Sequence, residues 1–499
     1  MNPFASKKFA RRVLVALAAI SGILFAVGCG SSASLGPPPL GGSFTNASLS
    51  GQYVMRQTGT GVNQAGTSAD PFSETTVFTA DGKGTLDVLE DDFNQDGTQF
   101  TGNGAGTYGI AKDGTGFLSF GGSNYAITLI DDSHFYLIEE DVFATSSGYG
   151  QMQDTTAFTA APSGTFVFKA HNLDTSSRVG GITITGGVIS GTEDLLNAGF
   201  SATSESVNSA VAMSAPSSTT GRGTFSLTDG TSFGYYVVNS TEFYFMSNGT
   251  SLEIGQAEAQ TGGPFSAATL ANGASYVFGS SGDTTISGPA GIHSAGVFTT
   301  DGVSSFTGGA VDYVQDTTVN SNLAVSGGSY TLAANGRGTI NLTLSGGSIS
   351  PQIFWMVNGS RAYFLVNSTL AVEDGTFSLQ QAAPTLNGQA ALVMDGFDTT
   401  LKDRVGDFET TSSTAFNWNQ TANAFDPSSG SGLVSTLGTN GTFTVSANGR
   451  VAVVVNNVTA SGVTPGVVFY LSSPNTGFMV QEDVQGYDIG GVFAQQASQ

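Results

Sequence analysis

Short alternations of apolar and polar residues, separated by glycine-containing turns, run along most of the chain. The segment from 275 to 380 shows the pattern well, with eight runs at 275–278, 296–300, 310–314, 328–332, 339–344, 352–357, 361–366 and 375–380. Alternation with a period of two indicates half-buried β-strands. Asp301-Gly302 and Asn335-Gly336 stand between consecutive runs, and such dipeptides strongly favour tight hairpins. The pattern therefore predicts an antiparallel meander of about eight strands.

The same unit occurs four times. A glycine-containing hairpin and the strand after it place Gly116, Gly223, Gly338 and Val451 at equivalent positions, about 110 residues apart. Each copy continues with an aromatic strand and closes on a glutamine, for which we expect Gln153, Gln260, Gln381 and Gln496. A fixed period of this kind is typical of tandem modules. We predict β-units at 48–159, 160–264, 265–382 and 383–499.

We predict an all-β fold in which each meander closes into a barrel, since closure removes both exposed sheet edges. A β-sandwich and propeller-like repeats are the alternatives. The Gly-x-Tyr or Gly-x-Phe opening and the count of eight strands resemble lipocalin- and avidin-type barrels. That resemblance implies an interior filled by side chains or by one small ligand, and it transfers no ligand residues. The Trp usual near the start of those families is Tyr53, Phe166, Tyr276 and Ala390 in this chain.

Residues 1–28 have the pattern of an export signal. Basic residues at 7–8 and 11–12 precede an apolar run from 13 to 27, which is shorter than a membrane-spanning helix. The run ends in Ala26-Val27-Gly28-Cys29, which resembles the lipobox of bacterial lipoproteins. The resemblance implies cleavage before Cys29, lipid attachment at its sulfur and a membrane as partner, and Gly30 favours the outer membrane. Residues 29–47, rich in Gly, Ser and Pro, are predicted to be a flexible tether.

Composition narrows the classes of function. The chain carries 38 Asp and Glu against 15 Lys and Arg, a formal net charge of -23, so we do not expect nucleic-acid binding. A single cysteine excludes an internal disulfide framework and a thiolate metal cluster. We predict no cofactor and no metal site from these patterns.

Few residues carry a signal for catalysis. His134, His171 and His293 fall at non-equivalent positions of three copies, so we interpret them as structural. The sequence from Gly230 through Ser232 to Gly234 matches the nucleophile motif Gly-x-Ser-x-Gly, but a turn precedes it and a strand follows it. That motif requires a helix after the serine, so we interpret the match as coincidental. No catalytic residue is predicted.

Asp92, Asn94 and Asp96, followed by Gly97, resemble the first half of a calcium-binding loop. The twelfth position is Asn103 where such loops have Glu, and no helical pattern flanks the segment. We interpret it as an acidic turn, with an incidental calcium site as the alternative.

Arg222, Arg337 and Arg450 occupy the same hairpin in three copies. We expect solvated turn residues, with contact to an acidic partner or a glycan as the alternative. Trp355 and Trp418 each occur in one copy, and we expect packing rather than sugar stacking for both. The aromatic strands are predicted to supply the cores.

Repetition without a repeated reactive constellation favours a non-catalytic function. We expect a lipid-anchored protein of the cell envelope that serves in adhesion or ligand binding, with a glycan or another surface ligand as partner. The alternatives are a glycan-active enzyme that uses paired carboxylates and a structural spacer. Two close carboxylates in a cleft, one of them desolvated, would favour the enzyme.

Overall fold

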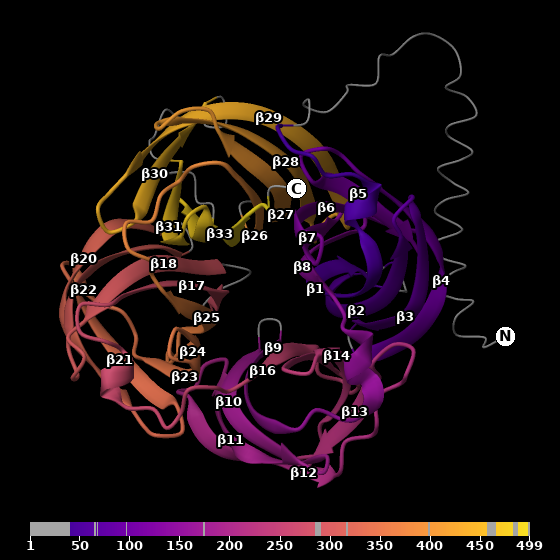
Figure 1. Cartoon of the computed structure of the whole chain (residues 1–499), viewed down its shortest axis with the longest axis horizontal. Helices are drawn as coiled ribbons and strands as arrows, with labels where there is room; N and C mark the ends of the chain where they lie inside the picture. Colours follow the sequence, from indigo (N-terminus) through magenta and orange to yellow (C-terminus); the bar gives the residue numbers. More distant parts are fainter. Residues whose placement is uncertain are drawn as a thin grey trace.

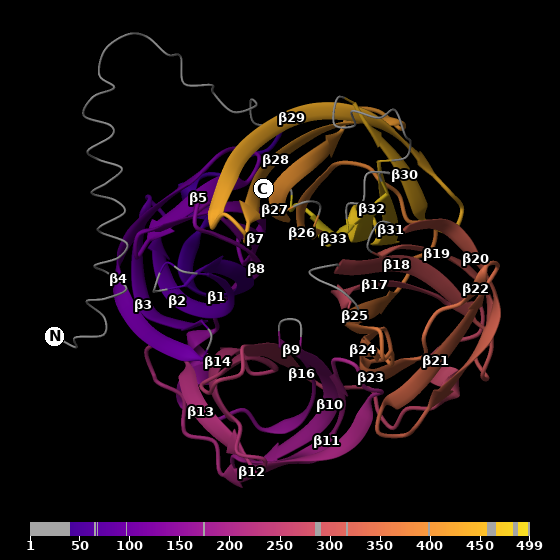
Figure 2. The ribbon, with the colours of Figure 1, turned by 180° about the vertical axis from the view of Figure 1, so that it is seen from behind.

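Four β-barrels follow one another around a ring in the computed structural model (Figure 1). The structure describes residues 40–499 except for 64–65, 67, 96, 173–174, 285–290, 316–317, 398–399, 457–465, 483–487 and 498–499. The prediction of an all-β chain with four barrel-like units of about eight strands is confirmed. The first and last strands of each barrel lie toward the middle of the ring, which is also seen from behind (Figure 2).

The first two barrels are closed antiparallel meanders of eight strands. The first contains β1 (Ser50–Val62), β2 (Ala69–Asp81), β3 (Thr85–Gln95), β4 (Thr98–Ile110), β5 (Thr115–Phe120), β6 (Ser123–Asp131), β7 (His134–Glu139) and β8 (Ala144–Met152). The second contains β9 (Gly164–Asn172), β10 (Ser176–Thr185), β11 (Val188–Asn197), β12 (Thr203–Val211), β13 (Arg222–Leu227), β14 (Ser232–Asn239), β15 (Glu242–Ser247) and β16 (Glu253–Ala259).

The third barrel carries one additional short strand, β22, beside β21, and the pairing of β20 with β21 closes its sheet. It contains β17 (Ser275–Thr284), β18 (Gly291–Thr300), β19 (Phe306–Gln315), β20 (Thr318–Leu332), β21 (Arg337–Leu344), β22 (Gly347–Ser348), β23 (Gln352–Asn358), β24 (Arg361–Val366) and β25 (Ala371–Leu379). The fourth is a closed meander of β26 (Gln389–Phe397), β27 (Leu401–Thr410), β28 (Ala415–Asp426), β29 (Ser431–Val445), β30 (Arg450–Val455), β31 (Val467–Ser473), β32 (Thr476–Gln481) and β33 (Asp488–Gln495).

Several strands are buried on both faces. In β7, Phe135 and Leu137 point into the first barrel, whereas Tyr136 and Ile138 pack against Val405 and other apolar residues of the fourth barrel. Similar clusters join the first barrel to the second, the second to the third and the third to the fourth. Each barrel therefore closes on itself, and its outer face packs on its neighbours.

A glutamine after each barrel fixes the next barrel around the ring. The side-chain amides of Gln153, Gln260 and Gln380 donate to main-chain oxygens of Val237, Met356 and Leu471 in the following barrel. Gln496 makes the same contact with Leu129 of the first barrel, which closes the ring. The prediction of Gln381 for the third copy is wrong by one residue, because Gln380 is the side chain that reaches the next unit.

Each of these glutamines lies against a glycine-containing turn of the following barrel. Gly336 has φ +92°, and a Cβ built on it would lie 2.6 Å from Nε2 of Gln260 and 3.2 Å from the ring of Phe265. Phe265 closes one end of the third barrel, and Phe44 plays the same part in the first. Phe44 is 3% exposed, so the last residues of the expected flexible tether are packed into the folded body. Three short 3₁₀ helices, Asn46–Ser48, Thr155–Thr159 and Ala267–Thr269, precede three of the barrels.

Candidate functional site

Three of the four interfaces between barrels contain the same buried group, which we call the interface triad. It consists of an aspartate on the third strand of one barrel with an arginine and an aromatic side chain of the next barrel. Arg222 Nε lies 2.5 Å from Asp92 Oδ2, Arg337 Nη2 lies 2.7 Å from Asp194 Oδ1, and Arg450 Nη2 lies 2.5 Å from Asp312 Oδ1. The aromatic members are Tyr236, Trp355 and Tyr470, each bonded to the same aspartate.

The triads correct the interpretation of Arg222, Arg337 and Arg450 as solvated turn residues. Asp92, Asp194 and Asp312 are all at most 3% exposed, so each arginine neutralises a buried charge. Burial raises the pKa of Asp312, but the hydrogen bonds from Arg450, Glu482 and Tyr470 and the charge of Arg450 together outweigh burial and hold that pKa below its ordinary value. The hairpin arginine that recurs in three copies therefore joins neighbouring barrels.

The ring-closing interface, between the fourth and first barrels, lacks the triad. The strand registers place Thr421, Thr115 and Thr128 where the other interfaces have Asp, Arg and the aromatic residue. Asp407 of β27 is buried at this interface, and neither of its carboxylate oxygens has a hydrogen-bond partner. Burial raises the pKa of Asp407 well above its ordinary value, and the nearby charges of Asp113 and Glu409 act in the same direction.

The segment considered for calcium lies within the interface between the first and second barrels. Asp92 accepts from Arg222 and Tyr236, and the side-chain amide of Asn94 donates to the main-chain oxygens of Gly249 and Ser251. Asp96 lies outside the described residues. Within the described part of the chain, no group of three or more His, Cys, Asp or Glu side chains is arranged to hold a metal ion.

The three histidines lie apart, each with its own surroundings. Nδ1 of His134 lies 2.9 Å from Asp131, Nδ1 of His171 lies 3.0 Å from Asp374 in the third barrel, and burial lowers the pKa of His293. Ser232 begins β14, and its hydroxyl accepts from Ser226 at 3.2 Å. Trp355 and Trp418 are 2% and 3% exposed, so packing is confirmed for both, Trp355 in an interface and Trp418 in the fourth barrel core.

Cys29 and the predicted lipobox lie outside the described residues. In the portion that the structure describes, no helix combines the length and the apolar character needed to cross a bilayer.

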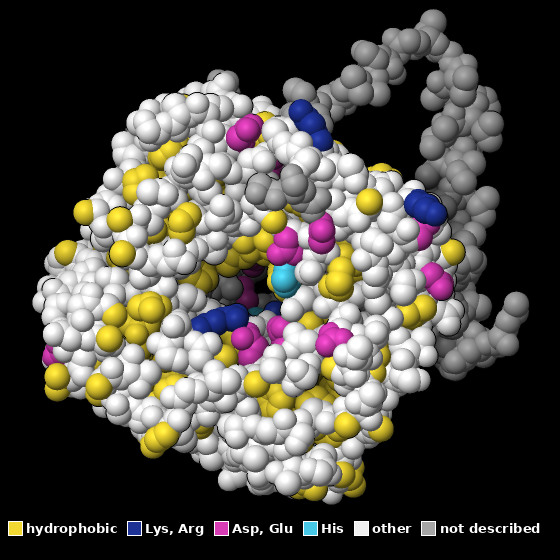
Figure 3. Space-filling view, viewed as in Figure 1, with side chains coloured by type: hydrophobic (Ala, Val, Ile, Leu, Met, Phe, Trp, Pro, Cys, Tyr) yellow, Lys and Arg dark blue, Asp and Glu magenta, His cyan; other side chains and the backbone are white. Residues whose placement is uncertain are grey.

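The ring surrounds a central hollow. Figure 3 shows acidic, basic and histidine side chains on its rim, with hydrophobic side chains gathered on another part of the rim. Side chains of three barrels meet in one polar group, which we call the axial cluster: Arg56 and Gln151 of the first barrel, Glu242, Tyr244, Gln256 and Glu258 of the second, and Arg361 and Tyr363 of the third. Two sets of hydrogen bonds make up this group, and the contact of Arg56 with the ring of Tyr244 joins them. Strands β1, β8, β16 and β24, which carry most of these residues, lie toward the middle of the ring in Figures 1 and 2.

The hydrogen bonds of the axial cluster run between barrels. Gln151 donates through Nε2 to Glu242 at 3.0 Å and accepts through Oε1 from the hydroxyl of Tyr244 at 2.6 Å. Arg361 Nη1 donates to Glu258 at 2.9 Å, and the Tyr363 hydroxyl also donates to Glu258. The Arg56 guanidinium lies 4.8 Å above the ring of Tyr244, and its Nε has no hydrogen-bond partner. The cluster holds two cations and two carboxylates, with Arg361 39% exposed.

The two carboxylates of the axial cluster are directly opposed. Glu242 on β15 pairs with Glu258 on β16 in the strand register, which places their Cβ atoms about 5 Å apart. Burial raises the pKa of Glu242, the charge of Glu258 raises it further, and the bond from Gln151 opposes both. Glu258 instead accepts hydrogen bonds from Arg361, Tyr363 and Gln256. One carboxyl is therefore desolvated while its neighbour is held by donors.

The fourth barrel contributes differently to the axis. The register of its first strand places Val393 where the first and second barrels have Arg56 and Lys169. Val393 and Val492 pack as partly buried hydrophobic residues against the first barrel. The axial cluster thus takes its members from three barrels, whereas the fourth packs apolar side chains against the first, so the pseudo-fourfold repetition is broken here.

No protein-family model matches the chain, and no curated protein matches it at a significant level of similarity.

Proposed function

We propose that the protein is a non-catalytic binding protein of the bacterial cell envelope, displayed from a membrane by lipid on Cys29, and that it binds a neutral glycan at the ring axis. The axial cluster carries this proposal, because it is the described polar group to which three barrels contribute. Its guanidinium, carboxylate, amide and phenol groups are planar donors and acceptors suited to hydroxyl ligands.

Charge favours a neutral glycan over an acidic one. The axial cluster has as many carboxylates as guanidinium groups, and the whole chain carries a formal charge of -23. An acidic polysaccharide would therefore be repelled at long range. His134 and Tyr149 stack with ring centroids 6.0 Å apart, and both rings are partly exposed beside the cluster. Such rings can pack against the apolar face of a sugar.

A glycan array and isothermal titration with cellohexaose, maltohexaose and chitohexaose, using the purified full chain, test this proposal. We expect binding to at least one neutral oligosaccharide, weakened at least tenfold by Arg361→Gln. Lys83→Gln removes an exposed cation outside the axial cluster and serves as the control. Absence of binding to every neutral glycan, or an unchanged affinity in Arg361→Gln, contradicts the proposal.

Hydrolysis of a glycan at the same place is the second candidate. Glu242 and Glu258 are directly opposed on neighbouring strands, and a pair of neighbouring carboxyl groups is what a retaining mechanism uses, with a protonated acid and an ionised nucleophile that flank the glycosidic bond. Glu242 has the desolvated environment of the acid, and Glu258, which accepts hydrogen bonds from Arg361 and Tyr363, would be the nucleophile. Release of reducing ends by the full chain, lost in Glu242→Gln and in Glu258→Gln while binding persists, would establish the enzyme over the binding protein.

A further inference from the structure

The interface that closes the ring buries a carboxylate without a partner among the described residues. Asp407 of β27 is fully buried, and within the described part of the chain neither of its oxygens has a hydrogen-bond partner. Burial of an unpaired charge is strongly unfavourable. An ionised Asp407 therefore needs a positive group that the surrounding side chains do not supply.

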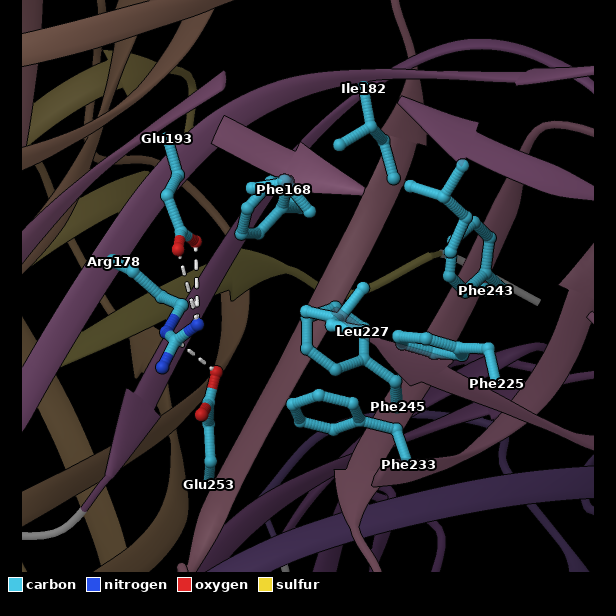
Figure 4. Close-up of a pocket in the computed structure, with 12 residues that line it drawn as sticks. Phe168, Arg178, Ile182, Glu193, Phe225, Leu227, Phe233, Phe243, Phe245 and Glu253 are labelled. Carbon is cyan, nitrogen blue, oxygen red and sulfur yellow. Dashed lines mark hydrogen bonds and ion pairs between the residues drawn. The ribbon is translucent and has the colours of Figure 1, made fainter. Parts of the chain in front are cut away.

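Other buried carboxylates do have a cation. Inside the second barrel, Arg178 lies 3.3 Å from a carboxylate oxygen of Glu193 and 3.0 Å from one of Glu253 (Figure 4). At three of the four interfaces, an arginine holds the aspartate of the interface triad. The side-chain charges that act on Asp407 are instead those of Asp113 and Glu409, and both are negative.

The strand registers show where the side chain of Asp407 is directed. Its equivalents in the second and third barrels are Gly181 and Val297. A Cβ built on Gly181 would lie 2.5 Å from the ring of Trp355, and Val297 packs in one cluster with Tyr470. Both rings are the aromatic members of interface triads. Asp407 is therefore directed at the corresponding position of the first barrel.

That position is Thr128. It pairs with Thr115 on β5 as Tyr470 pairs with Arg450 on β30. Thr128 is fully buried, and among the described residues its hydroxyl has no hydrogen-bond partner. Threonine is much shorter than tyrosine and tryptophan, so the carboxylate of Asp407 takes the side of the interface that faces a ring elsewhere. A carboxylate and a hydroxyl thus meet where the other interfaces have an aromatic contact.

We propose that the ring-closing interface binds a small monovalent cation, sodium or potassium, between the carboxylate of Asp407 and the hydroxyl of Thr128. The ion supplies the single positive charge that a guanidinium supplies at each of the other interfaces, and it joins the fourth barrel to the first.

The chemistry of the site fits such an ion. Carboxylate, hydroxyl and main-chain oxygens are ligands of sodium and potassium. The negative charges of Asp113 and Glu409 add to the attraction for a cation. One carboxylate is enough for a monovalent ion, so the site does not require the group of three metal-binding side chains that the described residues lack. The proposal depends neither on the glycan site nor on lipid at Cys29.

Thermal unfolding of the purified full chain at pH 8 in sodium, potassium and tetramethylammonium chloride of equal ionic strength tests the proposal, because tetramethylammonium is too large to lie between two packed side chains. We expect a midpoint at least about 3 °C higher in sodium or potassium chloride, since an ion that binds the folded state stabilises it. Asp407→Asn keeps the shape of the side chain and should reduce this difference to less than about 1 °C. Asp87→Asn removes an exposed carboxylate of β3 and should leave the difference unchanged.

Thr128→Val removes the hydroxyl and keeps the shape of the side chain. It should raise the cation concentration that gives half of the stabilisation at least threefold, and it provides the test if Asp407→Asn does not fold. The proposal is overturned if the three salts give the same midpoint, which is the result expected if a proton alone neutralises Asp407. It is also overturned if the difference between the salts persists in Asp407→Asn or disappears in Asp87→Asn.

Discussion

The side-chain amide of Gln496 lies 2.8 Å from the main-chain oxygen of Asp113, and this contact joins residues 383 positions apart in the chain. The same amide donates to Leu129, and three other glutamines make the equivalent contact between consecutive barrels. In the three consecutive pairs the chain itself also links the two barrels. Between the fourth barrel and the first, side-chain and main-chain contacts alone hold the ring together.

Gln496→Ala should therefore destabilise the folded ring. The substitution leaves two buried main-chain acceptors without their donor, a loss of about 1–3 kcal/mol in the free energy of unfolding. Equilibrium unfolding in urea measures this loss. Gln495→Ala removes the exposed neighbouring side chain and should change stability by less than about 0.5 kcal/mol. Equal effects of the two substitutions would contradict the role of Gln496.

Arg337→Met should cost more than an ordinary surface substitution. It leaves the carboxylate of Asp194, which is 1% exposed, without its cation, and such a loss amounts to about 3 kcal/mol. Adding Asp194→Leu removes the stranded charge, so the double variant should recover part of the lost stability. A double variant less stable than Arg337→Met would show that the aspartate does not depend on the arginine.

Gly336→Ala tests the close approach at the glycine turn. Both Gly336 and Gly273 have positive φ angles, +92° and +75°, but only at Gly336 would a Cβ contact other atoms within 4 Å. Gly273→Ala should therefore cost about 1 kcal/mol through backbone strain alone. Gly336→Ala must also displace Gln260 and Phe265, so its thermal unfolding midpoint should be clearly the lower of the two. Similar midpoints would argue against the close packing.

Stability should fall as the pH rises from 6 to 9. Burial raises the pKa of Asp403 and of Glu482 to about 8 and that of Glu373 to about 7. These carboxyls titrate near pH 4 in an unfolded chain, so their stabilising contribution is complete below about pH 4 and is lost as the pH rises through 7 to 8. Thermal unfolding at constant ionic strength should give a higher midpoint at pH 6 than at pH 8.5.

Other carboxylates set the acidic limit of that profile. Lys169 and His171 hold the pKa of Asp374 well below its ordinary value despite its burial, so the stability it contributes is lost as the pH falls below about 4. Since the carboxyls with raised pKa values lose stability above about pH 4 and Asp374 loses it below about pH 4, the most stable folded state is expected between about pH 4 and 5. Asp403→Asn should flatten the decline between pH 6 and 9, and an unchanged slope would mean that Asp403 does not titrate in this range.

The barrels could be predicted from the sequence because their determinants are local. Alternating residues and turns such as Asp301-Gly302 specify neighbouring strands, and neighbouring strands do pair. The ring could not be predicted in the same way, since Asp92 and Arg222 are 130 residues apart and nothing local marks them as partners. The sequence held one local signal of the packing between barrels. Residues 235–238 of β14 are all aromatic or aliphatic, so this part of the strand has no polar face, which indicates that both faces are packed.

The sequence did not indicate the axial cluster, because no residue type recurs at its positions in the four copies. Repeat comparison draws attention to residues shared by the copies, such as the hairpin arginines, and these serve assembly. His134, Glu242, Arg361 and Thr476 occupy one position of the repeat and differ in every copy. The glycan site that we propose lies at such divergent positions of the inner strands, whereas the shared positions serve the assembly of the ring.

The threonines of the ring-closing interface have a consequence for how the chain assembles. A ring that closed after three barrels would place Asp312 of the third barrel against Thr115 and Thr128 of the first. The aspartate would then be buried without a cation. The same free-energy cost would arise if the third barrel of a second molecule packed against the first barrel of this one. The fourth barrel has Thr421 at the position of the aspartate, so its contact with Thr115 and Thr128 buries no charge there. The ring-closing interface, which has threonines in place of the triad, therefore favours a ring that closes after the fourth barrel.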